Sequence, residues 1–241
     1  MAMESFQEIF YFKGGKLSEE YLKKLIFSIE NKKFDIPDVY VKDRIHIGGW
    51  CYGKILPGPF KKGYFLQGIH DAPINEIFNK IYKILFFPVL KLDATFFLNN
   101  VLKAENLFSL PFYTSADKLK KLDETIEKSR KYIIGVKLTS FNFKTGENLA
   151  ECISYLSNMK ILCGLEIYKR RNGEYPKKLE QLIPEIFQQL PVDPFTGKNF
   201  IYRKKEDRIL IYSVGKNLKD DGGIFDLKIG KDDIVWKNKK D

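Results

Sequence analysis

The sequence predicts an α+β protein with a mainly helical N-terminal part and a C-terminal part in which one long helix is followed by short strands. Apart from residues 33–73, apolar side chains recur at helical spacing up to Tyr168, whereas short β-branched and aromatic runs separated by Gly, Pro and Asp follow Gly173. The 241 residues are 44% hydrophobic and 15% aromatic, which is enough apolar surface for a folded core. This composition excludes a mainly disordered protein.

The N-terminal part, residues 1–146, is expected to form one mainly helical domain of no recognised family. Its first helix is predicted over residues 18–31, where apolar positions recur at helical spacing. Ser18 is a favoured N-cap residue, and the two glutamates that follow it suit the positive end of the helix dipole. We therefore expect this helix to begin at Ser18.

Glycine and proline interrupt the chain after this first helix. Residues 33–73 hold many of them, and they separate short aromatic and β-branched runs, which predicts an extended, loop-rich excursion. Helical spacing then resumes, but Pro88 lacks the amide hydrogen that a helix interior needs, so a break is expected there. The remaining N-terminal helices are predicted at residues 74–87, 93–107 and about 115–134.

The C-terminal part, residues 147–241, is predicted to be a second domain built on one long helix. That helix should start near Glu147 and end just before Gly173, because glycine readily adopts the left-handed C′ conformation and three basic residues precede it. Short β-branched and aromatic runs beyond it predict strands. The expected elements are a short helix or turn over residues 176–182 and strands over 200–203, 209–213 and 234–236.

The segment from Tyr168 to Trp236 carries a distinctive order of residues. Its marked positions are Gly173, Tyr175-Pro176, Leu179, Leu182, Pro191, Asp193-Pro194, Gly197, Tyr202, Tyr212-Ser213-Val214-Gly215, Gly222-Gly223 and Asp233-Ile234. This pattern resembles the C-terminal globular domain of type II secretion major pseudopilins over about residues 150–236. The resemblance implies a long helix packed against a small antiparallel sheet, with a calcium ion holding the C-terminal loop.

The C-terminal loop also suggests a cation site on physical grounds. Oxygen-bearing side chains crowd one short segment in which glycines let the backbone curl, namely Asn217, Asp220, Asp221, Asp226, Asp232 and Asp233. Calcium binds about six to eight oxygen ligands, and like-charged carboxylates repel one another in an ordered loop unless a cation lies between them. A hydrated acidic turn without an ion is the alternative interpretation.

The resemblance further implies which residues bind calcium. The loop aspartate of the family falls at Asn217, whose amide oxygen brings no charge, and the closing aspartate falls at Asp233. Asp220 or Asp221 would then supply the missing charge. The expected ligands, in order of preference, are the side chains of Asp233, Asp220, Asp221 and Asn217, with a backbone carbonyl oxygen from Val214 or nearby.

These expectations favour a non-enzymatic structural or protein-interaction component of a bacterial cell envelope. The protein would be pseudopilin-like, and its link would be to type II secretion. Its partners would be other envelope or secretion-system proteins, and it would act in the periplasm or at the envelope. The most apolar segment, residues 84–102, is interrupted by Pro88, Lys91 and Asp93 and is not expected to cross a membrane. We therefore expect any membrane attachment to use an anchor that is absent from this chain.

A thiol-dependent hydrolase is the alternative function. Cys51 lies in a glycine-flanked aromatic turn and His70 precedes Asp71, so the chain holds the thiol, imidazole and carboxylate that such enzymes combine. Nothing in the sequence shows that these groups meet, and a free cysteine is more often a small buried apolar residue. His46, in the alternating run VKDRIHI, is expected to lie in a strand. We expect no enzymatic activity.

Composition argues against a nucleic-acid binder. The net charge of +10 is spread along the chain, and only six of the 41 basic residues are arginine. Phosphate and guanine recognition favours arginine, because its planar guanidinium makes bidentate hydrogen bonds. The charge therefore indicates solubility rather than a nucleic-acid site. The three cysteines have neither the number of a disulfide framework nor the spacing of a zinc site.

Overall fold

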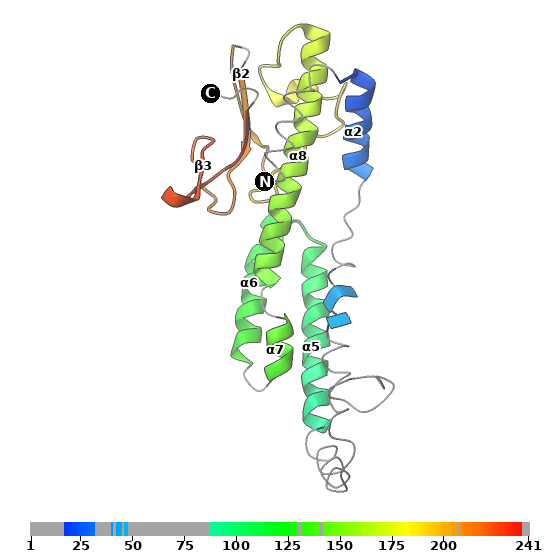
Figure 1. Cartoon of the computed structure of the whole chain (residues 1–241), viewed down its shortest axis with the longest axis vertical. Helices are drawn as coiled ribbons and strands as arrows, with labels where there is room; N and C mark the ends of the chain where they lie inside the picture. The colour runs from blue at the N-terminus through cyan, green and yellow to red at the C-terminus, as the bar shows by residue number, and fades with distance from the viewer. Residues whose placement is uncertain are drawn as a thin grey trace, which may run out of the picture. The chain divides into compact units, whose positions relative to one another are not determined.

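The chain folds as an α+β protein, as the sequence predicts (Figure 1). The computed structural model describes residues 17–31, 40, 42–44, 46–47, 87–129, 132–139, 142–206 and 208–237. The chain divides into two compact units. The helical unit is Asp35–Gly146, and the sheet unit combines Met1–Phe34 with Glu147–Asp241.

The boundary at Glu147 is where the sequence predicts a second domain to begin, but the first helix belongs with that second domain. α2 (Glu19–Asn31) begins as predicted, because Ser18 Oγ accepts a hydrogen bond from the Tyr21 amide at 3.2 Å. Leu22 and Ile26 of α2 are buried in the core of the sheet unit. The structure thus places α2 with the C-terminal elements, because its apolar stripe packs there.

Helix α5 (Phe87–Phe108) continues through the proline at which the sequence predicts a break. Pro88 lies in the first turn, where the amide hydrogen has no helical partner in any case. The predicted start of this helix at residue 93 is therefore wrong. The predicted helix over residues 74–87 lies outside the described residues except for its last position.

Two helices replace the single one predicted over residues 115–134. α6 (Phe112–Lys128) follows Pro111, which occupies the N-cap position, so it begins earlier than the Ser115 signal indicates. α7 (Ile133–Thr139) is a separate short helix. The Asp93 carboxylate on α5 accepts the Gly135 amide of α7 at 2.7 Å, which satisfies an amide near the start of that helix.

The predicted excursion over residues 33–73 is described at positions 40, 42–44 and 46–47, where the backbone is helical rather than extended. Tyr40 is buried, and its ring meets that of Phe108 edge-on with the centroids 4.7 Å apart. The prediction that His46 lies in a strand is wrong, because packing of this stretch overrides its local alternation. The rest of the excursion lies outside the described residues.

The long helix and the sheet agree with the sequence prediction at most of their ends. α8 (Asn142–Asn172) starts before Glu147 but ends as predicted, since Gly173 has a φ of 82° and its amide bonds Lys169 O at 2.8 Å. The short elements that follow are η3 (Leu179–Leu182), β1 (Ile201–Lys205), β2 (Arg208–Ser213), β3 (Phe225–Asp226), η4 (Leu227–Ile229), β4 (Lys231–Asp232) and β5 (Ile234–Lys237). The order β1-β2-β5 is antiparallel throughout, and β3 pairs with β4 in a separate hairpin.

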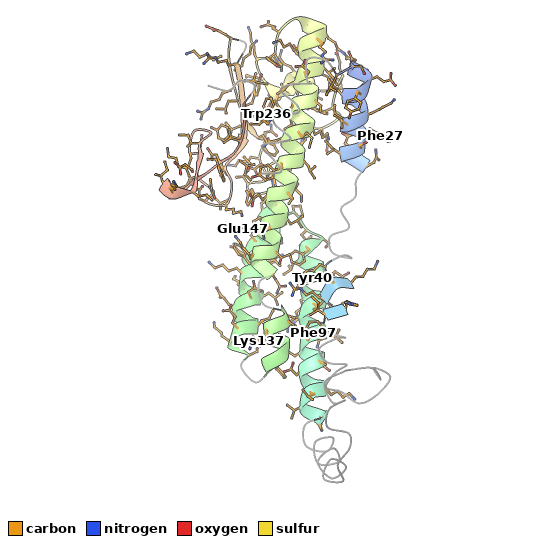
Figure 2. All side chains as sticks on the ribbon, in the orientation of Figure 1. Phe27, Tyr40, Phe97, Lys137, Glu147 and Trp236 are labelled. Atoms are coloured by element: carbon orange, nitrogen blue, oxygen red, sulfur yellow. The ribbon has the colours of Figure 1, made fainter. Side chains whose placement is uncertain are left out.

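The core of the sheet unit brings together α2, α8, η3 and the sheet. Its fully buried residues include Ile161 and Leu165 of α8, Leu182 of η3 and Ile211 of β2. The partly buried Trp236 of β5 packs against the same cluster (Figure 2). The loop that joins β2 to β5 therefore starts and ends at two paired strands that pack against this core, which we call the platform of the loop.

Candidate functional site

The acidic loop, residues 214–233, joins β2 to β5 and contains all the predicted calcium ligands. It leaves β2 at Val214, which is buried, and turns at once at Gly215. A Cβ atom on Gly215 would lie 2.2 Å from the Asp232 carbonyl oxygen, and its φ is 67°. The outgoing and returning limbs of the loop thus approach so closely that only glycine fits at this position.

Asp232 ties the returning limb of the loop to the outgoing limb. Its Oδ2 atom accepts hydrogen bonds from the amides of Lys216 and Asn217, both at 3.1 Å. Burial raises the pKa of Asp232, although these two amides act in the opposite direction. The sequence predicts Asp232 as a member of the acidic cluster but not as a ligand. Its role depends on the close approach of the two limbs of the loop at Gly215, which no local pattern in the sequence indicates.

Asp233 is the most deeply buried residue of the acidic cluster. It has no exposed surface, and its Oδ2 atom accepts the Gly223 amide at 2.7 Å. Its Oδ1 atom is also buried and makes no hydrogen bond of ordinary geometry within the described residues, although the Asp221 and Ile224 amides approach the carboxyl group closely enough to lower its pKa. Burial raises the pKa of Asp233, and the nearby Asp221 charge adds to the rise. A buried charged acceptor without a donor is costly, so this oxygen calls for a partner.

Asn217 and Asp221 form a pair beside the buried carboxylates. Asn217 Nδ2 donates to Asp221 Oδ2 at 2.8 Å and to the Gly230 carbonyl oxygen at 3.2 Å. Asn217 Oδ1 accepts the Lys219 amide at 2.7 Å within the same turn. Asn217 therefore donates to the Asp221 carboxylate, whereas an aspartate at position 217 would repel it.

Asp220 is held apart from this group by contacts to the sheet. Its Oδ1 atom accepts the Tyr212 hydroxyl at 2.7 Å and the Gly222 amide at 2.9 Å, and Oδ2 faces Arg203 Nη2 at 3.2 Å. The Tyr212 hydrogen bond is the main cause that lowers the pKa of this carboxyl group. A cation at Asp220 would have to compete with these three contacts.

The donor set fits calcium at Asp233 rather than at Asp220. In the part of the chain that the structure describes, no three His, Cys, Asp or Glu side chains are grouped as metal ligands. A site here would combine carboxylate oxygens with amide and backbone carbonyl oxygens, which calcium accepts and most transition metals do not. The orphaned Asp233 Oδ1 atom, close to the charge of Asp221, is the feature that fits a cation.

The residues of the alternative thiol site lie largely outside the described part of the chain. Neither Cys51 nor His70 is described, and His46 is an exposed residue of a helical stretch. Two described cysteines lie on α8: Cys152 is exposed, and Cys163 is buried, which raises its pKa to about 12. A thiol with such a pKa is not a nucleophile at neutral pH.

Comparisons with family models, with curated proteins and with solved structures found no match to this chain. Among the helices of the described residues, none has both the length and the apolar character required to cross a bilayer.

Proposed function

We propose that this chain is a non-enzymatic structural or protein-interaction component of a bacterial cell envelope, with a pseudopilin-like sheet unit whose acidic loop binds calcium. The packing of α8 with an antiparallel sheet supports the pseudopilin-like part of the proposal. The single observation that carries the calcium part is the buried, unpartnered Oδ1 atom of Asp233. Its partners would be other envelope or secretion-system proteins.

The residues that would hold the ion are the side chains of Asp233, Asp221 and Asn217, together with the Val214 carbonyl oxygen. A bound calcium ion would neutralise carboxylates that otherwise repel one another in this buried setting. The chain itself contributes the framework, because Asp232 already binds the Lys216 and Asn217 amides without an ion. The ion would therefore stiffen a loop that is preformed in part.

The position of the loop explains why stiffening it serves an interaction protein. Residues 214–233 join two neighbouring strands, so they stand on the rigid platform of β2 and β5. Lys216 also reaches α8, where its Nζ atom lies 2.6 Å from Glu151 Oε2. An ordered loop on such a platform loses less conformational entropy when a partner protein binds than a mobile one would.

Thermal unfolding in calcium and in chelator tests the proposal. Calcium in large excess over its dissociation constant is expected to raise the melting temperature by several degrees, since a ligand that binds only the folded state stabilises it. The Asp233→Asn variant keeps the shape of the side chain but removes its charge, and should lose this increment.

A buried aspartate outside the loop supplies the matched control. Asp193 is buried, and its Oδ1 atom accepts the Phe195 amide at 2.9 Å and the Ser213 hydroxyl at 2.8 Å. Asp193→Asn should lower the melting temperature equally in both conditions and keep the calcium increment. Identical melting curves of the unmodified chain in calcium and in chelator would refute the calcium site.

A further inference from the structure

We propose that the end of the acidic loop binds the surface of an anionic lipid bilayer. The inference rests on an apolar tip that stands beside unpaired lysines, and it is independent of calcium binding. The apolar tip consists of three large side chains of the β3-η4-β4 hairpin with their exposed fractions: Phe225 (55%), Leu227 (69%) and Ile229 (64%); Leu218 (62%) and Ile224 (42%) are exposed elsewhere in the same loop. Soluble proteins seldom cluster exposed apolar side chains in this way unless the cluster binds something.

The apolar tip is held by a hydrogen-bonded hairpin. β3 and β4 pair antiparallel, with Phe225 opposite Asp232, and η4 forms the end of the hairpin between them. Asp226 caps η4 by accepting the Lys228 amide at 3.0 Å, and Gly230 closes it with a φ of 70°. The exposed side chains are therefore presented by defined backbone. Figure 1 shows this hairpin, in orange and red, on the side of the sheet that faces away from α8.

The acidic side chains of the loop accept hydrogen bonds from donors within the sheet unit. Asp232 and Asp233 accept loop amides, Asp226 caps η4, and Asp220 binds Tyr212 and Arg203. The negative charges are thereby engaged within the sheet unit. On the hairpin, the exposed residues are apolar, glycine or Lys228, whereas Asp226 and Asp232 are half-buried; outside the hairpin, the Asp220 side chain is 47% exposed and pairs with Arg203.

Lysines supply the positive charge around the apolar tip. Lys219 and Lys228 are exposed, Lys231 is partly exposed, and none of the three ammonium groups makes an ion pair within the described residues. Apolar side chains that enter the boundary between headgroups and acyl chains, with lysines at the height of the phosphates, are the usual pattern of interfacial membrane binding. Each lysine near an anionic surface adds to the attraction.

Charge and shape favour a bilayer over a protein surface. A second copy of this chain would bring the same lysines to the contact, so self-association through the apolar tip would oppose like charges. A protein partner needs a groove matched to the hairpin, whereas a bilayer accepts a projecting apolar tip without any such match. The net charge of +10 for the whole chain also favours approach to an anionic surface.

Sedimentation with vesicles tests the proposal on the full chain. We expect binding to vesicles of phosphatidylcholine and phosphatidylglycerol in equal parts, and none to phosphatidylcholine alone, in chelator as well as in calcium. Phe225→Ala should weaken binding by about tenfold, because a large apolar side chain no longer leaves water. The matched control is Phe27→Ala, since Phe27 on α2 is 66% exposed but lies outside the loop, and it should not change binding (Figure 2).

A second pair of variants separates local charge from total charge. Lys228→Glu should weaken binding to the anionic vesicles several-fold, whereas Lys198→Glu makes the same change of net charge at another exposed lysine and should have little effect. Equal losses in these two variants would mean that only the total charge matters, and would overturn the proposal.

Three further results would overturn the proposal. They are absence of binding to either kind of vesicle, equal binding to both kinds, and self-association that depends on Phe225 without vesicle binding. The calcium proposal fails separately: a chain that binds anionic vesicles but melts identically in calcium and in chelator refutes the ion and supports the lipid contact.

Discussion

Asp123 on α6 accepts the first backbone amides of α8: Asn142 N donates to Oδ1 at 3.0 Å and Phe143 N donates to Oδ2 at 2.8 Å. The amides at the start of a helix have no partner within it, and a carboxylate there also interacts favourably with the helix dipole. A cap supplied from 19 residues earlier in the sequence explains why α8 begins before the predicted Glu147.

Removal of this remote cap should destabilise the helical unit. We expect Asp123→Ala to lower the free energy of unfolding by about 1 to 2 kcal/mol, in the range of helix caps. Denaturant unfolding measures this loss, and hydrogen exchange should show faster opening of residues 142–146. Asp117→Ala, an exposed position on the same helix, is the control. A loss of equal size in the control would mean that the cap contributes nothing specific.

Gly164 on α8 should tolerate no larger residue. A Cβ atom there would lie 2.5 Å from Cζ of Phe187, a buried ring that cannot move freely. Gly164→Ala should therefore destabilise the fold by about 1 to 3 kcal/mol, although the same change in an open helix is stabilising. At Gly146 the nearest atom is Leu119 Cδ1 at 2.8 Å, a less severe overlap than the 2.5 Å at Gly164, so Gly146→Ala should cost less. Denaturant unfolding of both variants gives the comparison.

Helix α2 should be essential to the stability of the sheet unit. Leu22 has no exposed surface, so Leu22→Ala is expected to lower the free energy of unfolding by about 2 to 4 kcal/mol. Phe27→Ala on the exposed side of the same helix should change it by less than about 0.5 kcal/mol. Similar values for the two variants would contradict the packing of α2 described above.

The contribution of Asp233 to stability should depend on pH in a defined direction. Its folded pKa is raised above the ordinary 3.8, so between these two values the folded chain holds a proton that the unfolded chain has lost. In chelator, this contribution to stability is therefore greatest at or below pH 3.8 and is lost as pH rises through the folded pKa. Asp220, whose pKa is lowered, contributes in the opposite sense, since its stabilisation is lost on acidification.

The calcium increment should fall as pH falls through the folded pKa of Asp233, because protons compete with the ion for the same oxygen. Melting temperatures measured against pH in calcium and in chelator give the increment directly. The difference between the unmodified chain and Asp233→Asn isolates this residue from other titrating groups. An increment that is the same below pH 3.8 as at neutral pH would contradict the assignment of Asp233 as the principal ligand.

Thiol labelling should distinguish the cysteines and test the alternative function. Cys152 is exposed and should react with a thiol-directed electrophile in the folded chain, whereas Cys163 should react only on unfolding. Mass spectrometry of the labelled peptides gives the three rates. A hydrolase that uses Cys51 requires this thiol to react faster than Cys152, and an inert Cys51 would end that alternative.

The sequence by itself determined the elements whose causes are local. The start of α2 at Ser18, the end of α8 before Gly173 and the positions of β1, β2 and β5 follow from residues within a few positions of each boundary. Caps, left-handed glycines and strand propensity act over one turn or one strand, so a single stretch of sequence contains them. The α+β class follows from the same signals. The concentration of carboxylates in one loop is visible directly in the sequence.

Only the tertiary structure decided the features that depend on distant partners. Asp123 sets the beginning of α8, packing on Phe108 accompanies the helical conformation at Tyr40, and the core of the sheet unit recruits α2. Within the acidic loop, Tyr212 and Arg203 hold Asp220, while burial leaves Asp233 with an unpartnered oxygen. Carboxylates that look alike in sequence differ here because the donors and the apolar surface around each one come from residues brought close only by folding.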